Sequence, residues 1–364
     1  MPISNVWWIH AALFIGLPAA GRAALTVQCV GNETELRAAL AAAGGSSPDD
    51  REVRLVRRVY FNGTTEFVAQ LGSLTGAFSL SGGWSPGCST RIDDPRATVF
   101  DAQGLSRVLV LRRDGVSGNR TPPIAVSNLT LRNGRAGDAP IGLHIANAFG
   151  SVEVDDLIVH GHRATASTAY AGTAITLQTS NGSRIGLRNV LAYDNAGVFG
   201  SGSQPLFDVM LNSFTPEVEH QFIITNTTID AAASASALLL YSTNTRYELF
   251  NNILRGEVRY DWTGGVAPLL RVRQVFNHMP AALFNTPPVI DLDVGNDAGD
   301  PQLDPVTFEP RPGSPAIDSG LGAPPGGQSA TDVYGRPRVA FTYIDRGALE
   351  SQVSPDTLFR DGFE

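Results

Sequence analysis

One short pattern recurs along the chain and limits the folds that it can adopt. Apolar residues alternate with variable ones, an Asn or Asp follows, and apolar residues alternate again directly after it. The pattern spans residues 124–131, 152–159, 185–192, 222–229 and 247–254. Its polar position, which we call the pivot, is occupied by Asn128, Asp156, Asn189, Asn226 and Asn251. Successive pivots are 28, 33, 37 and 25 residues apart, a spacing typical of stacked structural repeats.

Each half of the pattern predicts a short strand with one buried side. The apolar residue directly after the pivot breaks the alternation, because it must also point inward. A one-residue corner allows this, and Asn and Asp tolerate the left-handed backbone that such a corner needs. We expect the pivots of stacked coils to form a ladder in which side-chain amides bond neighbouring backbone groups.

A third apolar strand lies in each interval between copies of the pattern. The candidates are residues 108–111, 142–146, 174–178, 206–211 and 238–241. Three strands per coil predict an all-β protein with the triangular cross-section of a parallel β-helix. A β-propeller needs four strands per repeat, and a β-sandwich does not explain the pivots.

The N-terminal end of the predicted solenoid has a helix signal. Asn32 and Glu35 form a capping box, and Gly44 ends the helix. Such a helix is suited to cover the apolar end of the first coil, because terminal repeats need a cap.

The C-terminal part has no clear copy of the pattern. The predicted β-helix with its N-terminal cap spans residues 24–300, although residues 255–300 are less regular. Residues 301–350 are rich in Pro, Gly and Asp, and we expect them to close the last coil. Residues 351–364 are expected to form a flexible tail.

The first 23 residues predict a signal peptide. An apolar run at 11–17 is followed by Pro18 and by small residues up to Ala23, where we place the cleavage site. The run is too short to span a membrane, and no later segment resembles a transmembrane helix. We therefore expect an exported protein in the periplasm, at the cell surface or outside the cell.

The chain has two cysteines, Cys29 and Cys88. In an oxidising compartment, a disulfide between them is the default expectation. It would close a loop of about 60 residues and stabilise the fold by roughly 4 kcal/mol.

The charge argues against nucleic acid as a partner. Lys and Arg number 27 against 35 Asp and Glu, so the net charge is −8. Such a chain repels phosphate backbones, and no local basic cluster reverses this. We expect a monomer.

Three further stretches resemble a known group of proteins. They are residues 79–88 with 98–104, the segment Gly313–Gly320, and residues 332–338 with 345–350. Together with the repeats, they resemble bacterial exported right-handed parallel β-helix proteins of the pectin-lyase-like superfamily. The resemblance implies a right-handed coil. It does not imply an activity, because the superfamily includes lyases, hydrolases, esterases, adhesins and inert stalks.

The densest group of catalytic candidates is Asp155, Asp156, His160 and His162. It resembles the acidic and His motifs of polygalacturonase-like hydrolases, but their Asn-Thr-Asp and Lys have no counterpart here. Asp156 is also explained as a pivot. The two histidines share one side of a strand, but two ligands do not make a metal site.

A second group of candidates lies on the third set of strands. Alternation points His144, Thr176, Asp208 and Tyr241 outward, and Arg259 extends the row. Stacked coils would place these residues about 5 Å apart, where they would line a groove for an extended polymer. The alternative interpretation is a mixed, solvated face.

No cofactor is firmly indicated. The oxygen-rich segment Asp291–Asp300 is a candidate calcium site or else a solvated loop, and it lacks the spacing of an EF-hand.

Two hypotheses about function follow. We favour a secreted or cell-surface protein that binds polysaccharide or a surface partner without catalysis, because no complete acidic constellation is present. The alternative is a polysaccharide-degrading enzyme, either a lyase or a glycoside hydrolase.

Overall fold

The computed structural model describes most of the predicted β-helix and the C-terminal segment. The described residues are 24–44, 49–72, 76–114, 122–137, 140–165, 172–181, 183–197, 207–213, 215, 218–231, 236–242, 244–261, 270–285 and 287–352. The predicted signal peptide and most of the predicted tail lie outside these ranges.

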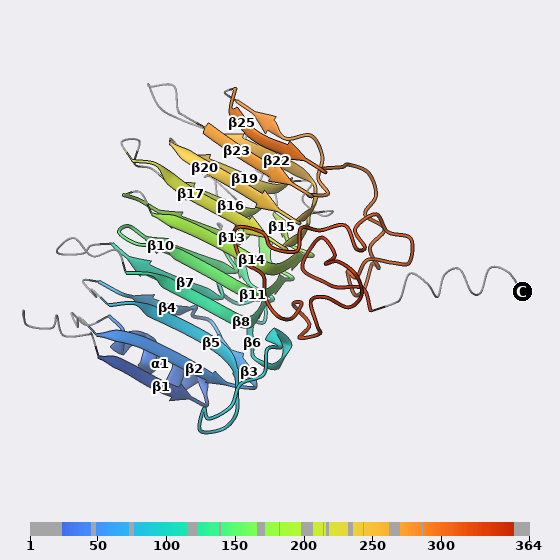
Figure 1. The fold of residues 1–364 in the computed structure, drawn as a ribbon. Helices are drawn as coiled ribbons and strands as arrows, with labels where there is room; N and C mark the ends of the chain where they lie inside the picture. The colour runs from blue at the N-terminus through green and yellow to red at the C-terminus, as the bar shows by residue number, and fades with distance from the viewer. Residues whose placement is uncertain are drawn as a thin grey trace, which may run out of the picture.

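The described protein is a solenoid of parallel strands stacked from the blue N-terminal end to the orange end in Figure 1. Its helical elements are α1 (Glu33–Ala42) and the 3₁₀ turn η1 (Pro95–Ala97). Among the described residues, no helix is long and apolar enough to cross a membrane.

The strands of the described residues form three sheets. The large sheet contains β1 Leu25–Val30, β2 Asp50–Val56, β3 Val59–Phe61, β5 Phe78–Trp84, β6 Val99–Asp101, β8 Ile124–Arg132, β11 Val152–His160, β14 Arg184–Tyr193, β17 His220–Thr225, β18 Thr228–Asp230, β20 Thr245–Phe250, β21 Ile253–Arg255, β23 Leu270–Val275 and β25 Val289–Val294. The eight-stranded sheet contains β4 Phe67–Gln70, β7 Leu109–Arg113, β10 Leu143–Asn147, β13 Gly172–Thr179, β16 Phe207–Ser213, β19 Ser236–Ser242, β22 Glu257–Asp261 and β24 Leu283–Phe284. The smallest sheet contains β9 Arg135–Ala136, β12 Arg163–Ala164 and β15 Ala196–Gly197.

The chain visits these sheets in turn. It runs from β8 in the large sheet through β9 in the smallest sheet to β10 in the eight-stranded sheet, and then returns in β11, parallel to β8. The strands that sequence analysis left unassigned between residues 255 and 300 continue the stack: β23 pairs with β20, and β25 pairs with β23.

All five pivots have the left-handed backbone that the pattern requires. Their φ angles are 58° at Asn128, 53° at Asp156, 53° at Asn189, 50° at Asn226 and 56° at Asn251. Pivot side chains also bond one another between coils: Nδ2 of Asn251 donates to Oδ1 of Asn226 at 3.0 Å, and Nδ2 of Asn189 donates to Oδ1 of Asp156 at 2.5 Å.

The corner at the pivot lets both halves of a strand bury apolar residues. In β11, Val152 and Val154 before the pivot and Leu157 and Val159 after it all belong to one core cluster. The eight-stranded sheet closes the same core from the other side. Its inward row includes Ile145, Leu177, Leu211, Leu240 and Tyr260 in register.

A second asparagine ladder, absent from the sequence analysis, begins directly after the pivot Asn251, at the corner between β20 and β21, and continues into the following coils. Asn252, Asn277 and Asn296 are linked because the Oδ1 of Asn277 accepts the N–H of Asn252 at 3.0 Å and the Oδ1 of Asn296 accepts the N–H of Asn277 at 2.8 Å. At a different corner, where the chain leaves β14, Oδ1 of Asn195 accepts the N–H of His162 at 3.2 Å. These amides satisfy buried backbone groups at the two corners.

The N-terminal end has the predicted helix. Oδ1 of Asn32 accepts the N–H of Glu35 at 2.9 Å, and Oε2 of Glu35 accepts the N–H of Gly31 at 2.6 Å. Leu36 and Leu40 are buried in the main core cluster, so α1 covers apolar surface of the first coils.

The predicted disulfide between Cys29 and Cys88 is present, with the two Cα atoms 5.7 Å apart. It ties β1 to the turn that follows β5. Structural disulfides of this kind are typical of proteins in oxidising compartments.

Residues 301–352, which we call the C-terminal module, pack along the side of the solenoid. An apolar cluster joins the module to the outer face of β11 and β14; it contains Ile158, Leu191, Phe308, Val333, Ala348 and Leu349. Figure 1 shows the module in red beside the stack. The expectation that this segment closes the last coil is therefore wrong, because the outward apolar residues of the large sheet bind it instead.

The last coil remains open as a result. Every residue of β25 is at least partly exposed, and the fractional exposure of Val289 is 52% and that of Ile290 is 47%. The described part of the chain thus leaves an apolar surface at the C-terminal end of the solenoid.

We expect Asn251→Ala to lower the free energy of unfolding by about 3 kcal/mol, because Ala disfavours the left-handed corner and cannot replace the buried hydrogen bonds of the amide. Asn251→Gly keeps the corner and should cost about 1 kcal/mol less. Urea unfolding followed by circular dichroism measures both.

Asn181, which has a φ of 58° but lies exposed outside the ladder, provides the matched control. Asn181→Ala should cost clearly less than Asn251→Ala. Equal losses at both positions, or a Gly variant no more stable than the Ala variant, would contradict this account of the corner.

Candidate functional site

The four predicted catalytic residues occupy different structural positions. Asp155 faces outward before the pivot and is ion-paired with Arg188, whose Nε donates to Oδ1 at 2.9 Å. Asp156 is the pivot itself and accepts hydrogen bonds from Asn189 and Ser329. Burial and the neighbouring carboxylate of Asp155 raise the pKa of Asp156 to about 6.

The two histidines are also separated. His162 is fully buried, and its Nδ1 accepts the N–H of Gly134 at 2.9 Å. A Cβ at Gly134 would lie 2.7 Å from this nitrogen, so the contact requires glycine. Burial lowers the pKa of His162 to about 3, which keeps the ring neutral. His160 lies at the end of β11 on the outer face and stacks on Tyr193.

The five residues of the predicted binding row on the eight-stranded sheet do not all lie in one register row. His144, Thr176 and Arg259 share one register row, but Met210 and Leu239 fill the positions expected for Asp208 and Tyr241. Asp208 is displaced because Leu211, and not Val209, pairs with Leu177 in the core. Tyr241 is displaced because it follows the inward Leu240 and pairs with Asn212 in the next row.

Three of the five predicted residues are also closed to solvent: His144, Thr176 and Asp208 are 7%, 2% and 0% exposed. Nε2 of His144 contacts Oε1 of Gln178 at 3.3 Å, and burial lowers the pKa of His144 to about 4.

The carboxylates of the predicted calcium segment contact protein groups. Asp291 pairs with Arg271 at 2.9 Å, and Asp297 pairs with His278 and with Arg346. Among the described residues, no group of three or more His, Cys, Asp or Glu side chains is arranged to hold a metal ion.

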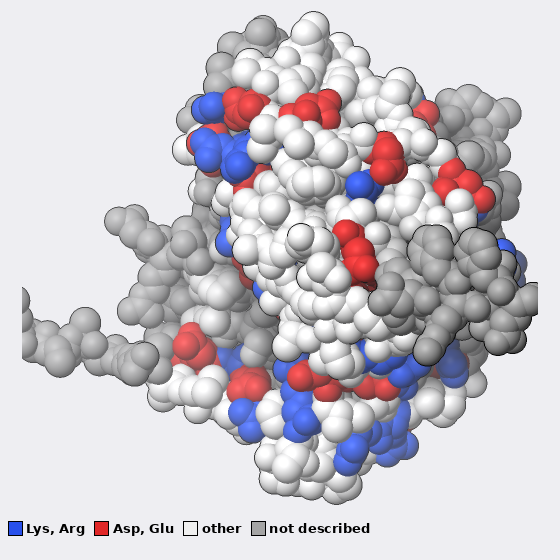
Figure 2. Space-filling model, turned by 45° about the vertical axis from the view of Figure 1, so that its right-hand side comes forward, with Lys and Arg blue, Asp and Glu red and all other residues white. Residues whose placement is uncertain are grey.

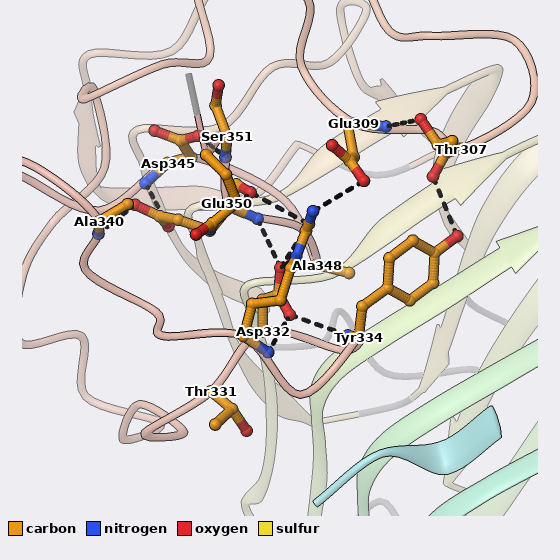
Figure 3. Close-up of polar contacts among 12 residues, drawn as sticks. Thr307, Glu309, Thr331, Asp332, Tyr334, Ala340, Asp345, Ala348, Glu350 and Ser351 are labelled. Atoms are coloured by element: carbon orange, nitrogen blue, oxygen red, sulfur yellow. Dashed lines mark hydrogen bonds and ion pairs between the residues drawn. The ribbon is translucent and has the colours of Figure 1, made fainter. Parts of the chain in front are cut away.

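Buried acids gather in the C-terminal module (Figure 3). Asp345 accepts the N–H of Ser351 at 2.6 Å, and Glu350 accepts the N–H of Asp345 at 3.1 Å. Burial raises the pKa of Asp345 to about 6 and that of Glu350 to about 8. Both side chains are at most 2% exposed, so these acids hold the module together and do not reach a ligand.

An outward row at the end of the large sheet is more open. It crosses six strands in register and contains Asp101, Arg132, His160, Tyr193, Asp230 and Arg255. We call it the outer row. From Arg132 onward each member lies four residues after a pivot, so the sequence did carry a signal for it. That signal was missed because the position differs in residue type from copy to copy.

Ion pairs lie at both ends of the outer row. Arg132 pairs with Asp101 at 2.8 Å, and Arg255 pairs with Asp230 at 2.9 Å. The arginine side chains are 36% and 40% exposed, whereas the carboxylates are 8% and 9% exposed. The row therefore presents guanidinium groups to solvent and keeps the acids beneath them.

Two stacked rings form the middle of the row. The ring centroids of His160 and Tyr193 are 4.7 Å apart with a 2° interplanar angle, and Phe308 of the module packs against Tyr193 at 4.4 Å. Burial and then the positive charge of Arg132 lower the pKa of His160. The stack is thus an aromatic element between two exposed cations, and the lowered pKa of His160 favours its neutral form.

Beside Arg255 lies a cavity of about 610 Å³, which we call the terminal hollow. Its walls include Leu254, Arg255, Met279, Pro280 and Leu283. The volume is within the range of small-molecule sites.

Charged residues on the module side of the molecule occur in small groups of both signs (Figure 2). The sequence contains no lysine, so all 27 residues counted as Lys or Arg are arginines. Arginine forms planar, bidentate pairs with carboxylates, which suits recognition of acidic groups.

The chain was compared with protein-family models, with curated proteins and with solved structures, and none of them matches.

We expect Asp156→Asn to stabilise the protein at about pH 8 by about 2–3 kcal/mol, because the raised pKa means that ionised Asp156 opposes folding. The contribution of protonated Asp156 to the free energy of unfolding of the wild type is fully present below about pH 4 and is lost as the pH rises through about 6. Urea unfolding at both pH values measures the difference between wild type and variant.

Asp194→Asn is the matched control, since Asp194 also has a left-handed backbone but is exposed and ion-paired with Arg163. It should show no comparable gain at high pH. A gain of the same size at both positions, or none at Asp156, would contradict the assignment.

Proposed function

We propose that this chain is an exported right-handed parallel β-helix protein with three strands per coil, similar to pectin-lyase-like proteins. It binds an extended acidic polysaccharide along the outer row and does not cleave it.

Two features support the finer description of the fold. The chain passes through three sheets between β8 and β11, and again between β11 and β14. Parallel crossovers of this kind are right-handed in about 98% of cases, because the twist of the strands favours that hand.

Export is supported by the predicted signal peptide at residues 1–23 together with the disulfide between Cys29 and Cys88. A disulfide persists where the surroundings are oxidising. An extracellular location would also bring the protein into contact with polysaccharides.

The outer row is the observation that carries the proposal. It runs across the strands, so Arg132 and Arg255 lie four strand spacings apart, about 19 Å. An extended chain of uronate sugars offers a carboxylate on each ring, and guanidinium groups bind carboxylates through charge-assisted hydrogen bonds. The phenol of Tyr193 and the imidazole of His160 add polar groups between the two arginines for sugar hydroxyls.

The state of the acids favours binding without cleavage. Hydrolysis needs a reachable carboxyl group that keeps its proton near neutral pH. Burial alone would raise the pKa of Asp101, but hydrogen bonds from Gln103, Asn133 and Arg132 outweigh it and lower this pKa. Asp156, whose pKa is raised, is engaged at a pivot by Asn189 and Ser329.

The test is binding of polygalacturonate, with a neutral glucan as comparison, measured by affinity electrophoresis and calorimetry. Arg132→Gln should weaken polygalacturonate binding about 10-fold, because it removes one charge-assisted contact worth about 1.5 kcal/mol. Neither unsaturated nor reducing ends should appear during incubation.

Arg271→Gln is the matched control. Arg271 is 40% exposed and ion-paired with Asp291 on the same sheet, but it lies outside the outer row. Equal losses in both variants would show general charge attraction instead of a site. Absence of binding would contradict the polysaccharide proposal, and release of products would contradict the non-catalytic one.

A further inference from the structure

Part of the wall of the terminal hollow is apolar. Leu254 and Met279 are 1% and 5% exposed at its walls, and Leu283 is 48% exposed beside them. Water in contact with such walls has few hydrogen-bond partners, so an apolar ligand group gains free energy by replacing it.

A second hollow of about 400 Å³ adjoins the first. The two share Met279, Pro280, Ala281 and Ala298 as walls, and the second adds the apolar side chains of Phe284 and Ile290. The second hollow also has two carboxylates in its walls: Asp293 accepts a hydrogen bond from Asn296, and Asp297 is paired with His278 and Arg346.

Arg255 supplies a cation in the wall of the terminal hollow. Its Nη1 donates to Oδ2 of Asp230 at 2.9 Å, which uses one of the five N–H groups of a guanidinium. The side chain is 40% exposed, so the remaining donors can bind a ligand anion.

The other ionisable residues of the terminal hollow are engaged by protein groups. Glu257 is paired with Arg259 at 2.7 Å. The ring of His278 contacts Asp297 through Nδ1 and the carbonyl oxygen of Gly299 through Nε2, the latter at 3.1 Å. Arg255 is therefore the group in the terminal hollow best placed to bind the anionic group of a ligand.

We propose that the terminal hollow binds a carboxylate amphiphile: the hydrocarbon chain lies along the two hollows and the carboxylate pairs with Arg255. This site shares Arg255 with the outer row, whereas its apolar walls lie outside that row. The apolar part of the ligand covers surface that the C-terminal module leaves open.

The test is calorimetric titration of the purified protein with laurate below its micelle concentration. Dodecyltrimethylammonium has the same chain with the opposite charge and should bind at least about 10-fold more weakly, the loss of one charge-assisted contact. Arg255→Gln should weaken laurate binding by a similar factor, and Leu283→Asp should weaken it further by placing a like charge in the hollow.

Leu283→Asp changes an exposed residue, so the fold should tolerate it, and Val306→Asp at a 79% exposed position is its matched control. Arg271→Gln is the control for Arg255→Gln. The proposal is overturned if wild type does not bind laurate, if both amphiphiles bind equally, or if the control variants lose as much affinity. The polysaccharide test uses neither laurate nor a variant of Leu283. A negative result in one test therefore does not contradict the other proposal.

Discussion

The one-residue corner at each pivot is the constraint on which the rest of the structure depends. A left-handed residue lets the chain turn while both neighbouring apolar residues point into the core. The side chain of the pivot then has no place in the core and bonds the next coil, as between Asn251 and Asn226. The corner also fixes which residue, four positions later, lies on the outer row.

The same corner holds the C-terminal module. Asn251 exchanges two hydrogen bonds with Leu321, and Asn189 donates to the carbonyl oxygen of Thr331 at 3.2 Å. An amide at a corner has donors and an acceptor left over after the ladder is made, and the module uses them. This explains why the module covers the side of the solenoid, and why the last coil stays open beside the terminal hollow.

Shifted pKa values in this protein mark structural acids. Asp156 is enclosed at the interface with the module, and Asp345 and Glu350 are enclosed within it. Burial disfavours a carboxylate whether or not it has a chemical task, so a raised pKa points to function only when the group is also reachable. A ligand can reach the guanidinium groups of Arg132 and Arg255 more easily, because these arginine side chains are exposed and the acids paired with them lie beneath.

The parallel stack, the pivots, the cap of α1 and the disulfide could be predicted from the amino-acid sequence, because each depends on local backbone preference, on the period of burial or on the presence of only two cysteines. The register between coils could not be predicted in this way and was established by the folded structure. A shift of two residues keeps the same face buried, so alternation alone could not tell that Leu211, not Val209, pairs with Leu177. Nor could it place the module or assemble the outer row, since both depend on which outward side chains become neighbours after the coils have stacked.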